Sequence, residues 1–345
     1  MKNKIAIFSD FHLGIKQDSA IWHKIALDWS VWFANNLNKN SIKDIVFLGD
    51  FFHMRNAISA NTLHIASQIL DNLKDFNLHF ILGNHDLYYA NEPTVSPVNL
   101  FQNRNNIKVY QKPEIVQFGN KKVLMCGWGY DPNQYKADVL FTHAEISLFR
   151  YNLEVSCCED GYKPSELLSN YDVVYSGHFH LRQERKWNNK RIVYVGNTFS
   201  MDHSDSYITQ KGFDILDLDT LKSAFVENTV SPKFYKITLS DLAEGKWEYA
   251  KLNDIIPNSM IKLIINRDIT VSDINTLTCI INGFKPLELV CEWENCKDFS
   301  QESAEVELRS FNMTDAIKKY IDLLDIPNKS EVSEYLLSLY QKSQG

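Results

Sequence analysis

The chain has 345 residues, enough for about two domains, and 44% of them are hydrophobic, so a large core can form and wholesale disorder is excluded. No apolar run reaches the ~18 residues of a membrane-spanning helix, and Ser9 and Asp10 interrupt the first run too early for a secretion signal. The six cysteines form no Cys-x-x-Cys pair, so a disulfide framework is not expected. We therefore expect a cytoplasmic protein of a reducing compartment.

The net negative charge is concentrated toward the C-terminus. The chain has 43 acidic and 36 basic residues, and residues 287–345 alone contain twelve of the acidic and six of the basic ones. The preceding residues are therefore nearly neutral. Acidity of the whole chain argues weakly against binding to polyanions, but it says little about this nearly neutral part.

Strand-like and helix-like patterns alternate over the first two hundred residues. Apolar residues recur every three or four positions in 22–37 and 63–73, after helix caps at Asp18 or Ser19 and at Ser59. This alternation with strands indicates an α/β fold. The predicted strands are apolar on consecutive positions, as expected when both faces are covered, and span 5–8, 45–48, 78–82, 123–126, 139–141, 173–175 and 192–195.

From about residue 231 the pattern changes to a small unit without the polar motifs described below. It contains a predicted strand at 261–265, a helix at 272–281 and another strand at 287–293. We therefore predict a first domain over 1–230 and a small α+β capping or DNA-binding domain over 231–298.

The last predicted domain, 299–345, contains two short amphipathic patterns on either side of Pro327. They cover 317–324 and 332–339 and predict a helical hairpin. Each helix is too short to be stable alone in water, so its apolar face must dock onto another surface.

Five of the predicted strands end at polar residues, and six of the ten histidines lie at these points. In open α/β sheets, ligands bind at the carboxyl ends of the strands. Carboxylates, an amide oxygen and imidazoles at one edge make a mixed oxygen and nitrogen metal site. The motifs are Asp10-Phe11-His12, Gly49-Asp50-Phe51-Phe52-His53, Gly83-Asn84-His85-Asp86, Thr142-His143 and Ser176-Gly177-His178-Phe179-His180.

Side chains alternate along a strand, so Asp10 and His12 are expected to face one way together, and so are His178 and His180. The candidate ligands are too numerous for one ion, whereas two ions that share a bridging carboxylate accommodate them. Two metals ~3.5–4 Å apart can stabilise both the attacking and the leaving oxygen at phosphorus. The candidates are Asp10, His12, Asp50, Asn84, His143, His178 and His180.

Each motif by itself is weak evidence. A single histidine after a strand is usually a surface or core residue, and Gly-Asp is a common turn. The five motifs in chain order, each after an apolar run, are what favours a metal site. By contrast, His23, His64 and His79 lie outside the pattern and are expected on the surface of helices or strands.

This set of motifs resembles the calcineurin-like metallophosphoesterase superfamily over roughly residues 4–200. More closely, it is similar to the SbcD-type nuclease subunits of DNA-repair and recombination complexes, including those of large phages. The resemblance implies a sandwich of two β-sheets flanked by helices, with a small α+β cap domain and a C-terminal helical hairpin.

The resemblance also implies the metal ligands and the cofactor. Two Mn²⁺ ions are expected, with Mg²⁺ as a possible substitute, because hard oxygen ligands are mixed with imidazoles. One ion would be held by Asp10, His12, Asp50 and His180, and the other by Asp50, Asn84, His143 and His178.

Three further residues receive catalytic roles from the resemblance. His85 would steer or protonate the leaving 3′ oxygen, Asp86 would orient its ring, and His53 would contact the scissile phosphate. Phosphoprotein phosphatases of the superfamily have Asp-Arg-Gly at the place of His53, where the arginine grips a phosphate monoester. Its absence here favours a phosphodiester.

The implied function is a DNA nuclease, with 3′→5′ exonuclease and endonuclease activity, that is the catalytic subunit of an ATPase-coupled repair or recombination complex. The implied partners are DNA, a coiled-coil ABC-type ATPase of the SbcC kind that binds the C-terminal hairpin, and a second copy of the chain, with 88–101 as a candidate dimer contact. Basic residues that could reach phosphates are Arg55, Arg104, Arg150, Arg182, Arg185, Lys186, Lys190 and Arg191.

Two other functions remain open. One keeps the fold but hydrolyses a small phosphodiester such as a cyclic nucleotide. The other is a scaffold that presents DNA ends and has lost catalysis, although every ligand position and His85 are present. Turnover of small diesters against DNA, with added metal, would separate these alternatives.

Overall fold

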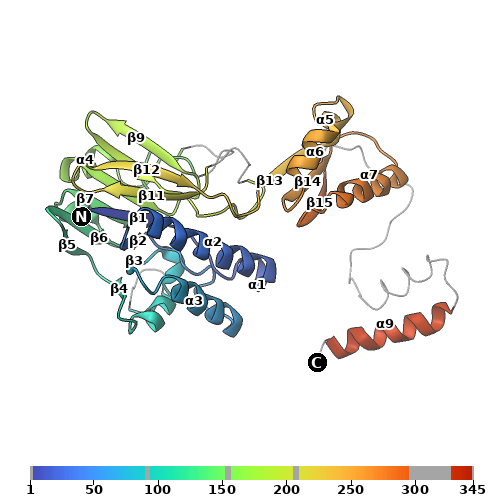
Figure 1. The fold of residues 1–345 in the computed structure, drawn as a ribbon, viewed down its shortest axis with the longest axis horizontal. Helices are drawn as coiled ribbons and strands as arrows, with labels where there is room; N and C mark the ends of the chain where they lie inside the picture. Colours follow the sequence, from blue (N-terminus) through green and yellow to red (C-terminus); the bar gives the residue numbers. More distant parts are fainter. Residues whose placement is uncertain (1–2, 90–93, 152–156, 205–209, 295–327, 344–345) are drawn as a thin grey trace. The chain divides into compact units, whose positions relative to one another are not determined.

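The computed structural model describes residues 3–89, 94–151, 157–204, 210–294 and 328–343 (Figure 1). The chain divides into two compact units, 1–265 with 269–292, and 266–268 with 293–345. Within the described residues, no helix combines the length and apolar character that crossing a bilayer requires.

The described residues contain two six-stranded sheets that build the body of the first unit. The first has the order β12-β11-β1-β2-β3-β4, and β1 to β4 are parallel neighbours. Its strands are β1 Lys4–Phe8, β2 Asp44–Phe47, β3 Asn77–Ile81, β4 Ile107–Tyr110, β11 Gly212–Asp217 and β12 Lys222–Glu227.

The second sheet has the order β5-β6-β7-β8-β10-β9, with parallel pairing from β6 through β7 and β8 to β10. Its edge strands β5 and β9 pair antiparallel with their neighbours. The strands are β5 Glu114–Phe118, β6 Lys121–Cys126, β7 Val139–His143, β8 Val173–Gly177, β9 Gln183–Trp187 and β10 Lys190–Tyr194.

The alternation of side chains along each strand creates three stacked cores. In β1, Ile5 and Ile7 join the core between the two sheets, whereas Ala6 and Phe8 face the helix side. In β6, Val123 and Met125 enter the same inter-sheet core. The central strands of both sheets are therefore covered on both faces, which explains why they are apolar on consecutive positions.

Helices α2 (Ala20–Lys39) and α3 (Ala60–Asn72) cover the outer face of the first sheet, as Figure 1 shows. Their apolar stripes bury Trp29 and Phe33 of α2 with Ile69 of α3. Helix α4 (Pro164–Asn170) covers the outer face of the second sheet. The predicted α/β sandwich of two sheets flanked by helices is confirmed.

The shorter elements of this sandwich are α1 (Ile15–Asp18) and three 3₁₀ turns. The turns are η1 (Asn84–Asp86), η2 (Pro97–Phe101) and η3 (Pro132–Gln134). The first of these turns carries the third polar motif, so it brings three candidate functional side chains directly beside the end of β3.

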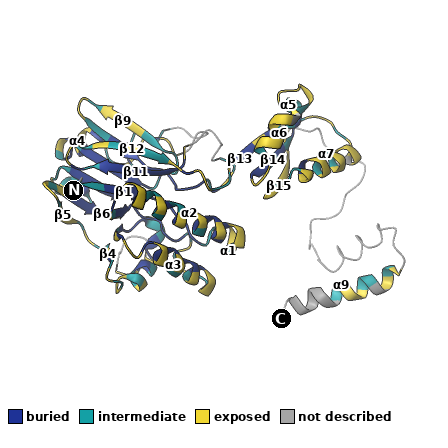
Figure 2. Cartoon of the chain, in the orientation of Figure 1, coloured by how far each residue is buried: buried dark blue, intermediate teal, exposed yellow. Residues whose placement is uncertain are grey.

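A third sheet follows with the order β13-β14-β15. The structure confirms two of its strands, predicted at 261–265 and 287–293, and the helix between them, predicted at 272–281. Strand β13 was not predicted. Figure 2 shows that β15 and α7 are largely exposed. The elements are β13 Phe234–Thr238, α5 Leu239–Ala243, α6 Tyr249–Ile255, β14 Met260–Ile265, α7 Val271–Gly283 and β15 Glu288–Trp293.

The predicted C-terminal hairpin is described only in its second half. Helix α9 (Lys329–Ser343) contains the predicted helix at 332–339, whereas the predicted helix at 317–324 lies outside the described residues. The boundaries proposed at residues 230 and 298 stay predictions.

Candidate metal centre and active site

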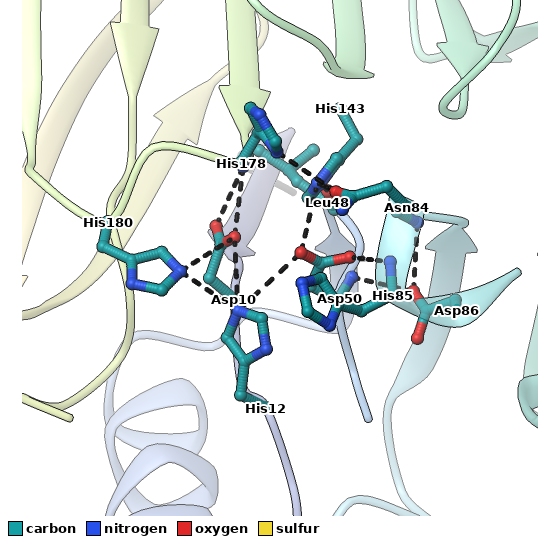
Figure 3. A network of polar contacts seen from close by, with 12 residues as sticks. Asp10, His12, Leu48, Asp50, Asn84, His85, Asp86, His143, His178 and His180 are labelled. Carbon is teal, nitrogen blue, oxygen red and sulfur yellow. Dashed lines mark hydrogen bonds and ion pairs between the residues drawn. The ribbon is translucent and has the colours of Figure 1, made fainter. Parts of the chain in front are cut away.

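The candidate ligands lie where strands of both sheets end, and several occupy a left-handed backbone conformation. Asp10, His12, Asp50 and His178 have φ values of +51°, +47°, +62° and +88°. Such conformations cost about 1–3 kcal/mol each in non-glycine residues and cluster at functional sites. They turn the chain sharply after each strand and aim these side chains at one another (Figure 3).

Side-chain and backbone atoms of neighbouring strand ends leave no room for a Cβ atom at Gly49, Gly83 and Gly177. A Cβ atom on Gly49, whose φ is +98°, would lie 2.6 Å from the Nδ1 atom of His143. A Cβ atom on Gly177 would lie 2.2 Å from Ser9 Oγ. Glycine at these positions therefore allows the strand ends to approach closely enough for their ligands to meet.

The first pocket is formed by Asp10, His12 and His180 beside Asp50, and the ligand atoms of the first three lie within 4.8 Å of one another. His12 Nε2 is 3.0 Å from His180 Nε2, 3.7 Å from Asp50 Oδ2 and 4.0 Å from Asp10 Oδ1. Metal ions lie ~2.0–2.2 Å from nitrogen and oxygen ligands, so the ligands of one ion are roughly 3–4 Å apart. The spacing suits one divalent cation.

The second pocket is formed by Asp50, Asn84, His143 and His178. The amide oxygen of Asn84 lies 3.1 Å from His143 Nε2 and 3.1 Å from His178 Nδ1. His143 Nδ1 lies 2.7 Å from the carbonyl oxygen of Leu48, which can only accept, so Nδ1 carries the proton.

When His143 gives up its second proton to bind a metal, its Nε2 carries a lone pair. It faces two oxygens, Asn84 Oδ1 at 3.1 Å and Asp50 Oδ2 at 3.4 Å. Converging acceptors need a cation between them, either a proton or a metal ion. The donor set therefore fits a second divalent ion, and Asp50 lies between both pockets.

The two imidazoles of the second pocket have different pKa values. Burial disfavours the charged form of His143, but the adjacent Asp50 outweighs burial and raises the pKa of His143 to about 9. Burial likewise opposes ionisation of Asp50, yet His143 holds the pKa of Asp50 well below its usual range. Burial and the nearby His143 lower the pKa of His178 to about 4. His178 therefore presents a neutral ring, the form that binds metals.

His85 lies at the edge of both pockets and is oriented by backbone contacts. The backbone N–H of His85 donates to Asp50 Oδ1 at 2.8 Å, and its ring Nδ1 donates to the carbonyl oxygen of His53 at 2.7 Å. The ring centroid lies 4.8 Å from that of His12. Nε2 is left to take or give a proton, which is what a general acid beside a phosphate requires.

The Asp86 carboxylate does not orient the His85 ring, contrary to the expectation from the resemblance. It is fully buried and accepts backbone N–H groups of Asp50 at 2.7 Å, Phe51 at 2.9 Å and Gly83 at 3.0 Å. Burial and the charge of Asp50 raise the pKa of Asp86 to about 7. Asp86 therefore positions the loop that carries Asp50.

The expectation that His178 and His180 face the same way is also wrong. His178 points to the second pocket and His180 to the first. The reason is local, because β8 ends at Gly177 and the left-handed φ of His178 interrupts the alternation of a strand. Asp10 and His12 do share the first pocket, although the chain there is a loop and not a strand.

The histidines outside the motifs do not all lie on the surface. His64 is exposed and His79 is partly buried, but His23 is buried, with Nε2 3.2 Å from Thr62 Oγ1 and Nδ1 3.2 Å from Asn61 Nδ2. The surface prediction for His23 is therefore wrong, because the helical period places it against α3.

Three side chains at the centre were not singled out from the sequence. Glu145 Oε1 lies 3.2 Å from His178 Nε2. The buried Lys211 donates through Nζ to the carbonyl oxygen of His180 at 3.0 Å. The Trp128 ring lies 4.9 Å from that of His178. None belongs to a motif, so only their contacts reveal them.

Comparison with known proteins agrees with this geometry. Residues 3–220 match the calcineurin-like phosphoesterase superfamily domain, so the chain belongs to this superfamily of metallophosphoesterases. Over 352 residues it is 26% identical to a protein of Enterobacteria phage T4 named exonuclease subunit 1, and the match covers 98% of each chain.

Two solved structures are also similar. One is a novel archaeal phosphodiesterase, with 16% identity, a TM-score of 0.37, and coverage of 65% of this chain and 99% of the other. The second is GAP50, the anchor in the inner membrane complex of Plasmodium, with 13% identity, a TM-score of 0.40, and coverage of 66% and 85%.

Proposed function

We propose that the protein is a two-metal DNA nuclease that hydrolyses phosphodiesters, with 3′→5′ exonuclease and endonuclease activity. The observation that carries the proposal is the pair of ligand pockets that share Asp50, with His85 beside both. The phage T4 relative, which matches along nearly the whole chain, is named an exonuclease subunit, and this supports a nucleic acid as the substrate.

The two ions, Mn²⁺ or in its place Mg²⁺, would supply the positive charge that stabilises the attacking and leaving oxygens of an in-line displacement. Asp10, His12, Asp50 and His180 would hold one, and Asp50, Asn84, His143 and His178 the other. His85, held through Nδ1 by the His53 carbonyl, would use Nε2 to steer the leaving 3′ oxygen or, as the imidazolium, to give it a proton. His53, half-buried beside it, contacts the scissile phosphate.

One feature favours a diester over a monoester, and another favours a nucleic acid over a small diester. The sequence after Asp50 lacks the Asp-Arg-Gly of monoester phosphatases, so no arginine from that motif grips a terminal phosphate. In addition, the partly exposed Trp128 ring borders the second pocket, and an aromatic face there can stack on a base.

Several of the basic residues that could reach phosphates are already ion-paired. Arg182 lies 3.0 Å from the buried Asp214, and Arg104 lies 2.6 Å from Asp71. Because these charges are neutralised, they contribute little to the electrostatic attraction between the protein and DNA phosphates. We infer that a partner supplies much of the affinity for DNA.

That partner is, in this proposal, a coiled-coil ABC-type ATPase of the SbcC kind in a repair or recombination complex, joined by a second copy of the chain as a homodimer. The word "subunit" in the relative's name supports an assembly. Helix α9 is the proposed docking element, since Tyr335 and Leu336 are 64% and 38% exposed and a helix of this length is marginal alone.

The experiment compares the wild-type protein with His85→Ala on linear DNA, a cyclic nucleotide and bis-nitrophenyl phosphate, each with added Mn²⁺ and with and without the ATPase. We expect DNA to be cut fastest, and the variant to lose a factor of about 10²–10⁴ in rate while it still binds metal. The exposed His64 provides the matched control, His64→Ala, which should cut DNA normally. Full activity of His85→Ala, or preference for the cyclic nucleotide, would contradict the proposal.

A further inference from the structure

Every imidazole that binds a metal has a second nitrogen, and its partner decides which nitrogen is the ligand. His143 uses Nδ1 to donate to the Leu48 carbonyl oxygen, so Nε2 faces the pocket. His178 is reversed, because its Nδ1 lies 3.1 Å from Asn84 Oδ1 and its Nε2 points outward. The outward nitrogen of His178 meets a side-chain carboxylate, Glu145 Oε1, at 3.2 Å.

Glu145 is held firmly by its own backbone. Its carbonyl oxygen accepts the N–H of Tyr162 at 2.9 Å, and the adjacent Ile146 forms a parallel bridge with Tyr162. Gly161, with a φ of +95°, passes so close that a Cβ atom there would lie 2.5 Å from the Glu145 carbonyl oxygen. The carboxylate therefore projects from a fixed point just after β7.

The contact differs from an ordinary surface ion pair. The side chain of His178 is 17% exposed and that of Glu145 is 35% exposed, so the contact is partly shielded from water. Exposed pairs contribute little because both side chains move freely. Here one partner is already fixed by the second pocket. Both ring nitrogens of His178 face acceptors, but Asn84 Oδ1 is shared with His143 Nε2, whereas Nε2 of His178 faces the charged carboxylate of Glu145, which is the stronger acceptor. We therefore expect the proton on Nε2.

We propose that Glu145 is a positioning residue of the second metal pocket. It accepts the Nε2–H of His178, and this fixes the tautomer and ring orientation in which the Nδ1 lone pair faces the metal. The carboxylate also makes the ring a more basic ligand. The inference rests on the metal centre of the proposed function, but not on its DNA substrate.

The test uses Glu145→Ala and Glu145→Gln, with Glu166→Gln as the control because Glu166 is an exposed glutamate whose charged neighbour is Lys163. Two quantities are measured without DNA. Long-range ¹H–¹⁵N NMR of the metal-depleted protein reports the His178 tautomer, with the signal assigned by its loss in His178→Asn. Calorimetry reports Mn²⁺ binding.

We expect the wild-type protein to show a single Nε2–H tautomer and Glu145→Ala to show a mixture. One of the two Mn²⁺ ions should bind about 10–100-fold more weakly to Glu145→Ala. In Glu145→Gln the amide oxygen still accepts the same hydrogen bond, so the tautomer should be restored and the affinity should recover in part. The control should match the wild-type protein in both measurements.

The inference is overturned if Glu145→Ala keeps one tautomer and wild-type Mn²⁺ affinity. It is also overturned if Glu145→Gln behaves like Glu145→Ala, because the role would then be charge alone. A wild-type protein that fails to cut DNA would refute the proposed function and leave both measurements decisive for Glu145.

Discussion

The two metal pockets hold their imidazole rings in different ways. In the second pocket, His143 and His178 each use the outward nitrogen in a hydrogen bond, to Leu48 O and to Glu145. In the first, His12 Nδ1 is buried and, within the described part of the chain, has no hydrogen-bond partner, and the His180 side chain is 37% exposed. The second pocket is therefore preorganised and the first is looser, so the two ions should bind with unequal affinity.

The largest effect should come from the carboxylate that both pockets share. Asp50→Asn removes the bridging charge, so neither ion is held in place and the charge stabilisation of the reaction, worth several kcal/mol, is lost. We expect the rate of Mn²⁺-dependent diester hydrolysis to fall by more than about 1,000-fold. The check is a cleavage assay with parallel calorimetry. A variant that binds two ions as tightly as the wild-type protein would show that Asp50 does not bridge.

An effect of intermediate size is expected on Mn²⁺ affinity, which should differ between the two pockets. We expect Mn²⁺ titration of the wild-type protein to show two classes of site that differ at least about tenfold, since partners of ligating histidines change metal affinity by 10–100-fold. His178→Ala should remove the tighter class and His180→Ala the weaker one. Calorimetry or electron paramagnetic resonance measures both. The reverse assignment would contradict the comparison of the pockets.

The smallest effect should come from the support of the first pocket. Lys211 is buried and its Nζ donates to the carbonyl oxygen of His180 and to the side-chain oxygen of Asn197. Lys211→Met keeps the unbranched apolar part of the side chain but donates no hydrogen bond, so the His180 carbonyl should lose this contact. We expect the weaker class of Mn²⁺ site to lose about tenfold in affinity.

The control for this change is the tighter class of site in the same variant, which should keep its affinity, together with the melting temperature. Loss of both classes, or a large fall in melting temperature, would mean that Lys211 supports the fold and not the first pocket.

Local patterns were sufficient for the elements that are apolar on consecutive positions or strongly periodic. A short stretch of sequence is enough to show the apolar pattern of such an element. This is why we could predict strands β1, β2, β3, β7 and β8 and helices α2 and α3. Edge strands such as β5 and β9 were missed, because their residues are mostly exposed and show no apolar run. The buried β11, which carries Asp214 and begins at a glycine, was missed as well.

From the sequence alone, the side chains that gather at this site could be predicted, because polar residues that directly follow parallel strands lie at the carboxyl ends of the sheets. Only the tertiary structure decided how they divide between two pockets, that Asp86 serves the Asp50 loop, and that Glu145 and Lys211 support the histidines. The physical reason is that these outcomes depend on left-handed turns and on contacts between residues more than thirty positions apart. Neither of these features produces a periodic pattern in the sequence.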